Sequence, residues 1–277
     1  MGINSLRQLF YLHSAKQFDI IYKVINLDIN EFFAQYDSVA LAFSGGVDSA
    51  LVLALAKRYA KCVKAYFVKS QFQPEFELND AKATAQKLGA DLTVIEYDIL
   101  QNKSVTANPE NRCYYCKRDI LGAIKSAANA DGFNTLLDGT NASDNADDRP
   151  GTKALNEFGI LSPLKLCGIT KSEVRRLARE NGLEVHNKPS YACLATRIPT
   201  GEVITATKLS ATEKAENELF KLGFKNFRVR YSPAFAKLEM SGADMKLLSQ
   251  KKQAVLDALK PYYNSVLLDL NERKDDE

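Results

Sequence analysis

The residues best suited to covalent or metal chemistry are three cysteines, Cys113, Cys116 and Cys193. Cys113 and Cys116 lie within one turn at the expected start of a helix, which favours the thiolate, and Cys193 lies in a segment without periodicity. Three thiolates can hold an iron–sulfur cluster with one iron open or, with a water, a catalytic zinc ion. Alternatively, Cys193 is a nucleophile or sulfur donor beside a redox pair, or the three thiols are unrelated and buried.

A glycine-rich stretch between an apolar run, 38–43, and a run of strong helix formers, 50–58, is the second candidate for chemistry. Its residues are Ser44, Gly45, Gly46, Val47, Asp48 and Ser49. Successive N–H groups at a helix N-terminus bind anions, the two serines add hydroxyl donors, and Asp48 can hold a magnesium ion that bridges phosphate oxygens. No Gly-Lys-Ser/Thr follows, so this is not the Walker loop. The alternative is an ordinary Gly-Gly turn with a helix cap.

The elements around this loop alternate between strands and helices, which predicts parallel βαβ units and a doubly wound parallel α/β sheet of Rossmann-like type. The expected strands are 38–43, 63–68, 91–98, 135–138 and 160–164. Ligands of such sheets bind beyond the carboxyl ends of the strands. Asp138, Asn141 and Asp144 follow one strand end, so we expect them to touch the nucleotide or magnesium unless their segment is only a solvated loop.

Four regions are expected along the chain. Residues 1–37 are a helical segment packed on the main domain, with helices near 18–25 and 29–33, and residues 38–186 are the nucleotide-binding domain. Residues 187–201 form an active-site loop that crosses to a small α+β domain at 202–277. In that domain we expect helices at 206–222 and 243–259 and strands at 226–231 and 236–240.

Arg228 and Arg230 alternate with Phe227, Val229 and Tyr231, so a strand would place both arginines on one face. Two neighbouring guanidinium groups suit a phosphate. The alternative is a solvent-facing strand whose arginines pair with Glu239 on the next strand.

The composition argues against a nucleic-acid-binding, a membrane or a secreted protein. The 277 residues include 37 basic and 34 acidic ones, a balance that argues against a nucleic-acid partner. We expect no membrane segment and, without a signal-peptide layout, a cytoplasmic protein whose five cysteines are reduced. Two of these, Cys62 and Cys167, have no cysteine neighbours and are expected in the core.

The motifs, taken together, resemble the LarE family of ATP-dependent sulfur transferases, which belongs to the PP-loop ATP-pyrophosphatases and makes the nickel-pincer nucleotide of lactate racemase. The resemblance covers about residues 15 to 270. The segments that carry it are 44–49, 112–117, 138–141, 189–199 and 227–230.

The resemblance implies that ATP adenylates a carboxylate of pyridinium-3,5-biscarboxylic acid mononucleotide, with release of pyrophosphate, and that sulfur then displaces AMP to give a thiocarboxylate. Cys193 matches the family's sulfur-bearing cysteine, which members without the Cys-x-x-Cys sacrifice to dehydroalanine. Members with all three cysteines hold a [4Fe-4S] cluster, and this type is favoured here. The same resemblance assigns the substrate phosphate to Thr196, Arg197, Arg228 and Arg230, and a metal-site carboxylate to Glu216. ATP, Mg²⁺ and the cluster are thus the expected cofactors.

Three other functions stay open at this point. The first is tRNA thiolation, since some PP-loop tRNA-modifying enzymes also use three cysteines and a cluster. The second is ammonia-dependent chemistry like that of the NAD and GMP synthetases, which leaves the cysteines without a role. The third is a non-catalytic adenine-nucleotide sensor that binds zinc. We expect a small-molecule nucleotide substrate and a homo-oligomer, whereas the sequence does not identify the sulfide donor.

Overall fold

The computed structural model describes residues 28–144, 150–189 and 191–273. Within these ranges, the larger sheet has four parallel strands in the order β3-β2-β1-β4. Its strands are β1 (Ser38–Ala42), β2 (Cys62–Lys69), β3 (Asp91–Glu96) and β4 (Leu136–Leu137). The predicted α/β class and parallel sheet are therefore confirmed.

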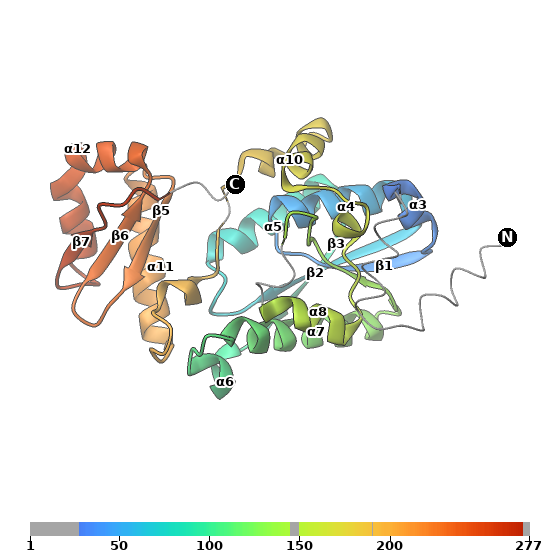
Figure 1. Ribbon diagram of the computed structural model, residues 1–277, viewed down its shortest axis with the longest axis horizontal. Helices are drawn as coiled ribbons and strands as arrows, with labels where there is room; N and C mark the ends of the chain where they lie inside the picture. Colours follow the sequence, from blue (N-terminus) through green and yellow to red (C-terminus); the bar gives the residue numbers. More distant parts are fainter. Residues whose placement is uncertain (1–27, 145–149, 190, 274–277) are drawn as a thin grey trace.

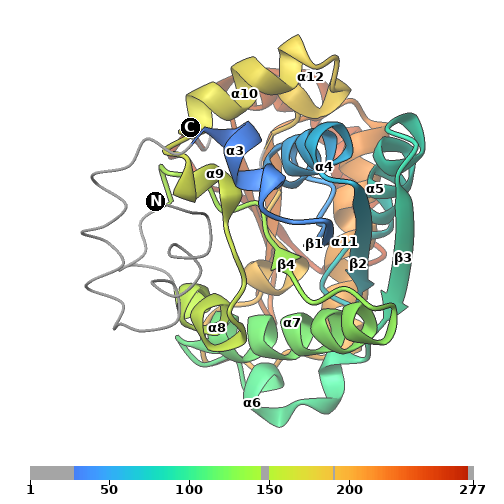
Figure 2. The same ribbon diagram turned by 90° about the vertical axis from the view of Figure 1, so that its right-hand side faces the viewer.

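Two layers of helices cover this sheet (Figures 1 and 2). One face packs against α3 (Ile29–Ala34), α4 (Val47–Tyr59), α5 (Glu75–Lys87) and α10 (Lys171–Glu180). The other face packs against α7 (Arg112–Ala130) and α8 (Pro150–Phe158). Because both faces are covered, residues of β1 that point either way are buried, and Val39, Ala40 and Leu41 are each fully inaccessible.

The smaller sheet has the order β5-β6-β7 and lies to one side of the larger one (Figure 1). Its strands are β5 (Phe227–Tyr231), β6 (Ala236–Met240) and β7 (Val266–Leu268), and its helices are α11 (Ala206–Lys221) and α12 (Gly242–Leu259). It has its own apolar core, which includes Phe224, Val229 and Leu238. The separate core supports a division into two domains, whose limits stay a prediction.

Short helices connect these elements. They are η1 (Ile99–Gln101), α6 (Lys103–Thr106), α9 (Pro163–Leu166), η2 (Glu184–Asn187) and η3 (Leu194–Arg197). No helix in the described ranges combines the length and the apolar character needed to cross a membrane.

The structure corrects three expectations. The strand expected at 160–164 is a single bridge between Leu137 and Leu161, because Pro163 has no N–H for a ladder and instead begins α9. The third strand of the small sheet, β7, was not predicted. Cys62 is exposed rather than in the core, and Cys167 is only partly buried. The helix expected near 18–25 lies outside the described residues.

Candidate active site

The Ser44–Ser49 loop joins β1 to α4 at the carboxyl edge of the larger sheet. Gly46 is the N-cap of α4, and Gly45 has a φ of +74°, a left-handed conformation that favours glycine. A Cβ at Gly45 would lie 2.9 Å from the Cβ of Ala81 on α5. The loop therefore needs glycine both for its backbone angle and for its contact with α5.

The two serine hydroxyls of the loop hold its shape. The Oγ atoms of Ser44 and Ser49 lie 3.1 Å apart, and Ser49 Oγ donates to the carbonyl of Gly46 at 3.1 Å. The Gly46 N–H donates to Ser44 Oγ at 3.3 Å. These hydroxyls and the amides of the first turn of α4 are the neutral donors with which the loop can meet a phosphate.

Asp48 has two partners from distant parts of the chain. Asn141 donates its side-chain N–H to Asp48 Oδ1 at 3.1 Å, and the Lys171 ammonium lies 2.5 Å from Asp48 Oδ2. Asn141 was a predicted site residue, and the structure brings it to the loop. Lys171 was recognised only as part of a helix-capping sequence. Its one signal in the sequence is its place shortly after the last expected strand, where the chain is still close to the carboxyl edge of the sheet.

Asp138 supports this edge from inside the protein. It is buried, and it accepts hydrogen bonds from the Thr140 backbone and hydroxyl and from the Ser162 hydroxyl at 2.6 Å. The neighbouring Gly139 lies against the first turn of α4, since a Cβ there would be 2.8 Å from the Ser49 nitrogen. Asp138 thus fixes the 138–141 turn against the loop, and its contact with a nucleotide stays a prediction.

The three cysteines come from two segments that meet. Cys113 and Cys116 are the second and fifth residues of α7, and Cys193 is the N-cap of η3. The next residue, Leu194, donates its N–H to the carbonyl of Phe72, just beyond the end of β2. Cys193 therefore lies at the same sheet edge as the PP-loop. Cys116 and Cys193 pack on an apolar cluster that includes Phe72, while Cys113 is exposed.

A pair of buried polar residues ties these two segments together. The Arg112 guanidinium donates to Asn108 Oδ1 and to the carbonyl of Ala195, both at 2.9 Å, and lies 3.5 Å from Cys113 Sγ. Asn108 in turn donates to the carbonyl of Pro199 at 2.7 Å. Neither residue is assigned a role from the sequence alone, because these contacts depend on how the two segments fold together.

Burial controls the protonation of the thiols. Burial, the largest cause, and the nearby Cys193 charge together raise the pKa of Cys116 to about 12. Burial likewise raises the pKa of Cys193, whereas Arg112 opposes that rise. For Cys116 the expected bias toward the thiolate is wrong, since desolvation outweighs the helix terminus and the arginine. The described residues contain no group of three His, Cys, Asp or Glu side chains placed to hold a metal ion.

Arg197 and Glu216 form a buried ion pair. Arg197 Nε and Nη2 donate to the two oxygens of Glu216 at 2.8 and 3.1 Å, and the side chains are 0% and 2% exposed. Glu216 also accepts from the Val229 N–H at 3.0 Å and from the Tyr191 hydroxyl. The remaining Arg197 nitrogen donates to the carbonyl of Ala192 and to Thr196 Oγ1.

This network bears on two predicted roles. A metal ion on Glu216 would have to displace one of four hydrogen-bond donors, and a phosphate would have to compete for an arginine that is already paired. Both roles stay predictions. Tyr191, whose ring lies 4.4 Å from the Arg197 guanidinium carbon, completes the network and was not foreseen.

Arg228 and Arg230 lie on β5 as the alternation predicted, and Phe227 and Val229, which alternate with them, are buried. Arg230 Nε donates to Glu239 at 2.7 Å, and its Nη1 donates to the carbonyl of Thr196. Arg228 is the register partner of Glu239 on β6. The expected pairing of β5 with Glu239 on β6 is therefore present. The second bond of Arg230, to the carbonyl of Thr196, joins the small sheet to the segment that carries Cys193.

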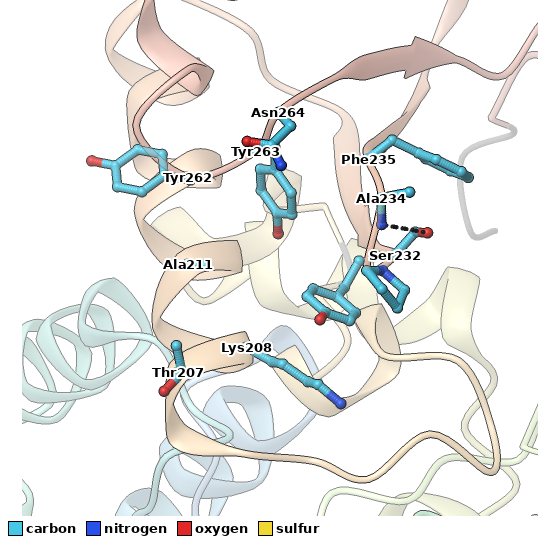
Figure 3. A pocket seen from close by; sticks show the side chains of 11 residues that line it. Thr207, Lys208, Ala211, Ser232, Ala234, Phe235, Tyr262, Tyr263 and Asn264 are labelled. Atoms are coloured by element: carbon cyan, nitrogen blue, oxygen red, sulfur yellow. Dashed lines mark hydrogen bonds between the residues drawn. The ribbon is translucent and has the colours of Figure 1, made fainter.

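A pocket of about 230 Å³ lies in the small domain between α11 and the turn from β5 to β6 (Figure 3). Tyr231 lines this pocket and also packs on the apolar cluster of Cys116 and Cys193. Lys208, at the pocket rim, is held by Glu202 at 2.7 Å. The pocket is thus adjacent to the cysteine region and separate from the PP-loop.

Comparisons with known proteins agree with this geometry. Residues 35–107 match the asparagine synthase family. The pyridinium-3,5-bisthiocarboxylic acid mononucleotide synthase of Lactiplantibacillus plantarum is 33% identical over 207 residues, 74% of this chain and 75% of that protein. An uncharacterized protein of Synechocystis sp. is 39% identical over 215 residues, 77% of this chain and 80% of its own, and one of Methanocaldococcus jannaschii is 29% identical over 217 residues, 78% and 83% of the two chains.

The parallel sheet with its Ser-Gly-Gly-Val-Asp-Ser loop defines an ATP-using enzyme of the PP-loop class. Within that class, the chain belongs to the LarE family, as the identity over three quarters of the Lactiplantibacillus synthase shows. The predicted family is therefore confirmed.

Proposed function

We propose that this enzyme is a sulfur transferase that converts a carboxylate of pyridinium-3,5-biscarboxylic acid mononucleotide to a thiocarboxylate, with sulfur delivered through a [4Fe-4S] cluster on Cys113, Cys116 and Cys193. The observation that carries the proposal is the contact, through Arg112, between the two segments that carry these three cysteines, near the sheet edge that holds the PP-loop. Membership of the LarE family supports the choice of substrate.

In the first half of the reaction, a carboxylate oxygen of the substrate attacks the α-phosphorus of ATP, and the bond to the β-phosphate oxygen breaks. The Ser44–Ser49 loop would bind the departing pyrophosphate through its amides and hydroxyls. Asp48 would hold a magnesium ion on the phosphates, with Asn141 orienting its carboxylate at 3.1 Å. The products of this step are the acyl adenylate and pyrophosphate.

In the second half, sulfur attacks the acyl carbon and the bond to the AMP oxygen breaks, without a change in oxidation state. AMP is a good leaving group, which explains why activation comes first. The donor set fits the cluster, because three thiols leave one iron without a protein ligand. Cys113, Cys116 and Cys193 would hold the cluster, which would supply the sulfide for this step. Thr196 of η3, together with Arg228 and Arg230 of β5, would hold the substrate phosphate.

Iron and acid-labile sulfide in anaerobically reconstituted protein test the proposal. We expect the wild type to be brown and to bind both, and we expect alanine variants of the three cysteines to lose them. Cys167→Ala is the matched control, since Cys167 is also a partly buried thiol but lies away from α7 and η3. A colourless wild type that binds no iron would refute the cluster.

Assays on the same protein preparation distinguish the proposed function from its alternatives. Dehydroalanine at Cys193 after one turnover, found by mass spectrometry, would identify a sacrificial cysteine instead of a cluster. Salt-sensitive binding of tRNA would identify a tRNA-thiolating enzyme. Failure of the carboxylate substrate to release pyrophosphate from ATP would refute the activation step.

A further inference from the structure

Two arginines are buried among the residues that the structure describes, Arg112 and Arg197. Arg197 is paired with the carboxylate of Glu216. Arg112 is 8% exposed, and no Asp or Glu of the described ranges forms an ion pair with it. Its hydrogen-bond partners are the uncharged groups of Asn108, Ala195 and the Cys113 thiol. Burial of a charge is costly unless an opposite charge accompanies it, so the position of Arg112 suits an anion beside it.

The two segments that carry the cysteines fix the guanidinium group of Arg112 in place. Its Nη1 donates to Asn108 Oδ1, which precedes α7, and to the carbonyl of Ala195 in η3, both at 2.9 Å. Its Nη2 lies 3.5 Å from Cys113 Sγ. Because Nη1 is already shared by two oxygens, Nη2 is the terminal nitrogen that remains for an anion, and its partner is a sulfur atom.

The charge of Arg112 acts on the other two cysteines as well. Burial raises the pKa of Cys116 and of Cys193, and the Arg112 charge opposes both rises. Three thiolates outweigh the positive charge of a [4Fe-4S] core, so the loaded site would be an anion, and reduction by one electron would make it more negative. A buried guanidinium beside this site supplies the opposite charge.

We propose that Arg112 is a positioning residue of the cysteine site, which provides the counter-charge of the [4Fe-4S] cluster and donates an N–H···S hydrogen bond to its Cys113 ligand. This inference rests on the cluster of the proposed function and assigns a residue to its surroundings. Positive charge and hydrogen bonds at the ligand sulfurs raise the reduction potential of a cluster, because both stabilise the more negative, reduced form. The same contacts strengthen the binding of the iron by its ligands.

Iron retention and reduction potential, both measured on anaerobically reconstituted protein, test this role. In competition with an iron chelator, Arg112→Gln should retain iron about 10- to 100-fold less well than the wild type, the usual effect of removing a group that hydrogen-bonds a metal ligand. Its reduction potential, from a redox titration followed by electron paramagnetic resonance, should be lower than that of the wild type. Arg112→Lys keeps the charge and should stay close to the wild-type potential.

Two matched variants separate the charge of Arg112 from its anchoring bonds. Arg118→Gln removes a charge from an exposed position of the same helix, where Arg118 lies over the Tyr114 ring, and should leave both measurements close to the wild type. Asn108→Ala removes an anchor of Nη1 but keeps the guanidinium. It should therefore reduce the iron content and leave the potential of the remaining cluster unchanged.

The outcomes distinguish the role of Arg112 from the proposed function. A potential in Arg112→Gln equal to that of the wild type, whatever its iron content, would overturn the counter-charge without affecting the assignment of the cluster. If Arg112→Gln binds no cluster, a cluster of wild-type potential in Arg112→Lys supports the role of the charge. Loss of iron from both variants would instead assign Arg112 to anchoring alone and overturn the proposal. A wild type that binds no iron would refute the cluster itself, and this inference with it.

Discussion

The Arg197–Glu216 pair gives the sharpest prediction for stability. Glu216→Ala removes the acceptor of four hydrogen bonds and leaves a guanidinium that is 0% exposed without its counter-charge. Breaking a buried ion pair from one side costs about 3–5 kcal/mol, because the remaining charge stays desolvated. We therefore expect Glu216→Ala to lower the free energy of unfolding by about that amount, measured by urea denaturation with circular dichroism.

Two further variants isolate the cause. Glu218→Gln, on the same helix, breaks an exposed pair with Lys221 whose side chains are 31% and 70% exposed, and should cost at most about 1 kcal/mol. Replacing both partners, Arg197→Met with Glu216→Leu, should recover most of the loss, since no charge is then left buried. A Glu216→Ala protein within about 1 kcal/mol of the wild type would refute this reasoning. If a chelator destabilises the wild type but leaves the stability of Glu216→Ala unchanged, the result would favour a metal ion bound by Glu216.

Three other perturbations have defined outcomes. Burial raises the pKa of Glu77 to about 7 from its ordinary 4.5, so the folded state keeps a proton that the unfolded chain has lost. Stability should therefore fall as the pH rises from about 4.5 to about 7, and Glu77→Gln should flatten this dependence in urea titrations across that range. Gly45→Ala should abolish ATP binding, measured by calorimetry, because its Cβ would lie 2.9 Å from that of Ala81 at a φ of +74°. Asn108→Ala removes the link from Arg112 to Pro199 and should reduce the iron bound per chain after reconstitution more than it reduces binding of AMP.

The parts of the site that the sequence predicted are those governed by local chemistry. Two glycines between an apolar run and a run of helix formers specify the turn from β1 to α4 wherever the rest of the chain goes. The alternation around Arg228 and Arg230 similarly fixes which side chains of β5 are buried. The resemblance to the family, rather than local chemistry, is what predicts that the three cysteines act together.

The parts that it missed depend on distant contacts. Lys171 reaches Asp48, and Arg112 reaches Ala195, only after the chain has crossed the sheet. The pairing of Arg197 with Glu216 requires the crossing segment to pack on α11, and no local pattern separates such an arginine from one that awaits a phosphate. Desolvation of Cys116 belongs to the same class, since burial is a property of the whole fold.

Helix α5 connects the two halves of the site. Near its middle, Ala81 leaves no room for a side chain at Gly45 of the PP-loop. At its N-terminus, the Glu75 N–H donates to Glu213 of α11 at 3.0 Å, and the Phe76 ring lies 4.9 Å from that of Tyr191 in the crossing segment. One rigid helix thus contacts the loop that would activate the carboxylate, the segment that carries Cys193 and the small domain. A shift of α5 on nucleotide binding would therefore move Tyr191. The Tyr191 hydroxyl donates to Glu216, and Glu216 accepts from the Val229 N–H, which lies between Arg228 and Arg230 on β5.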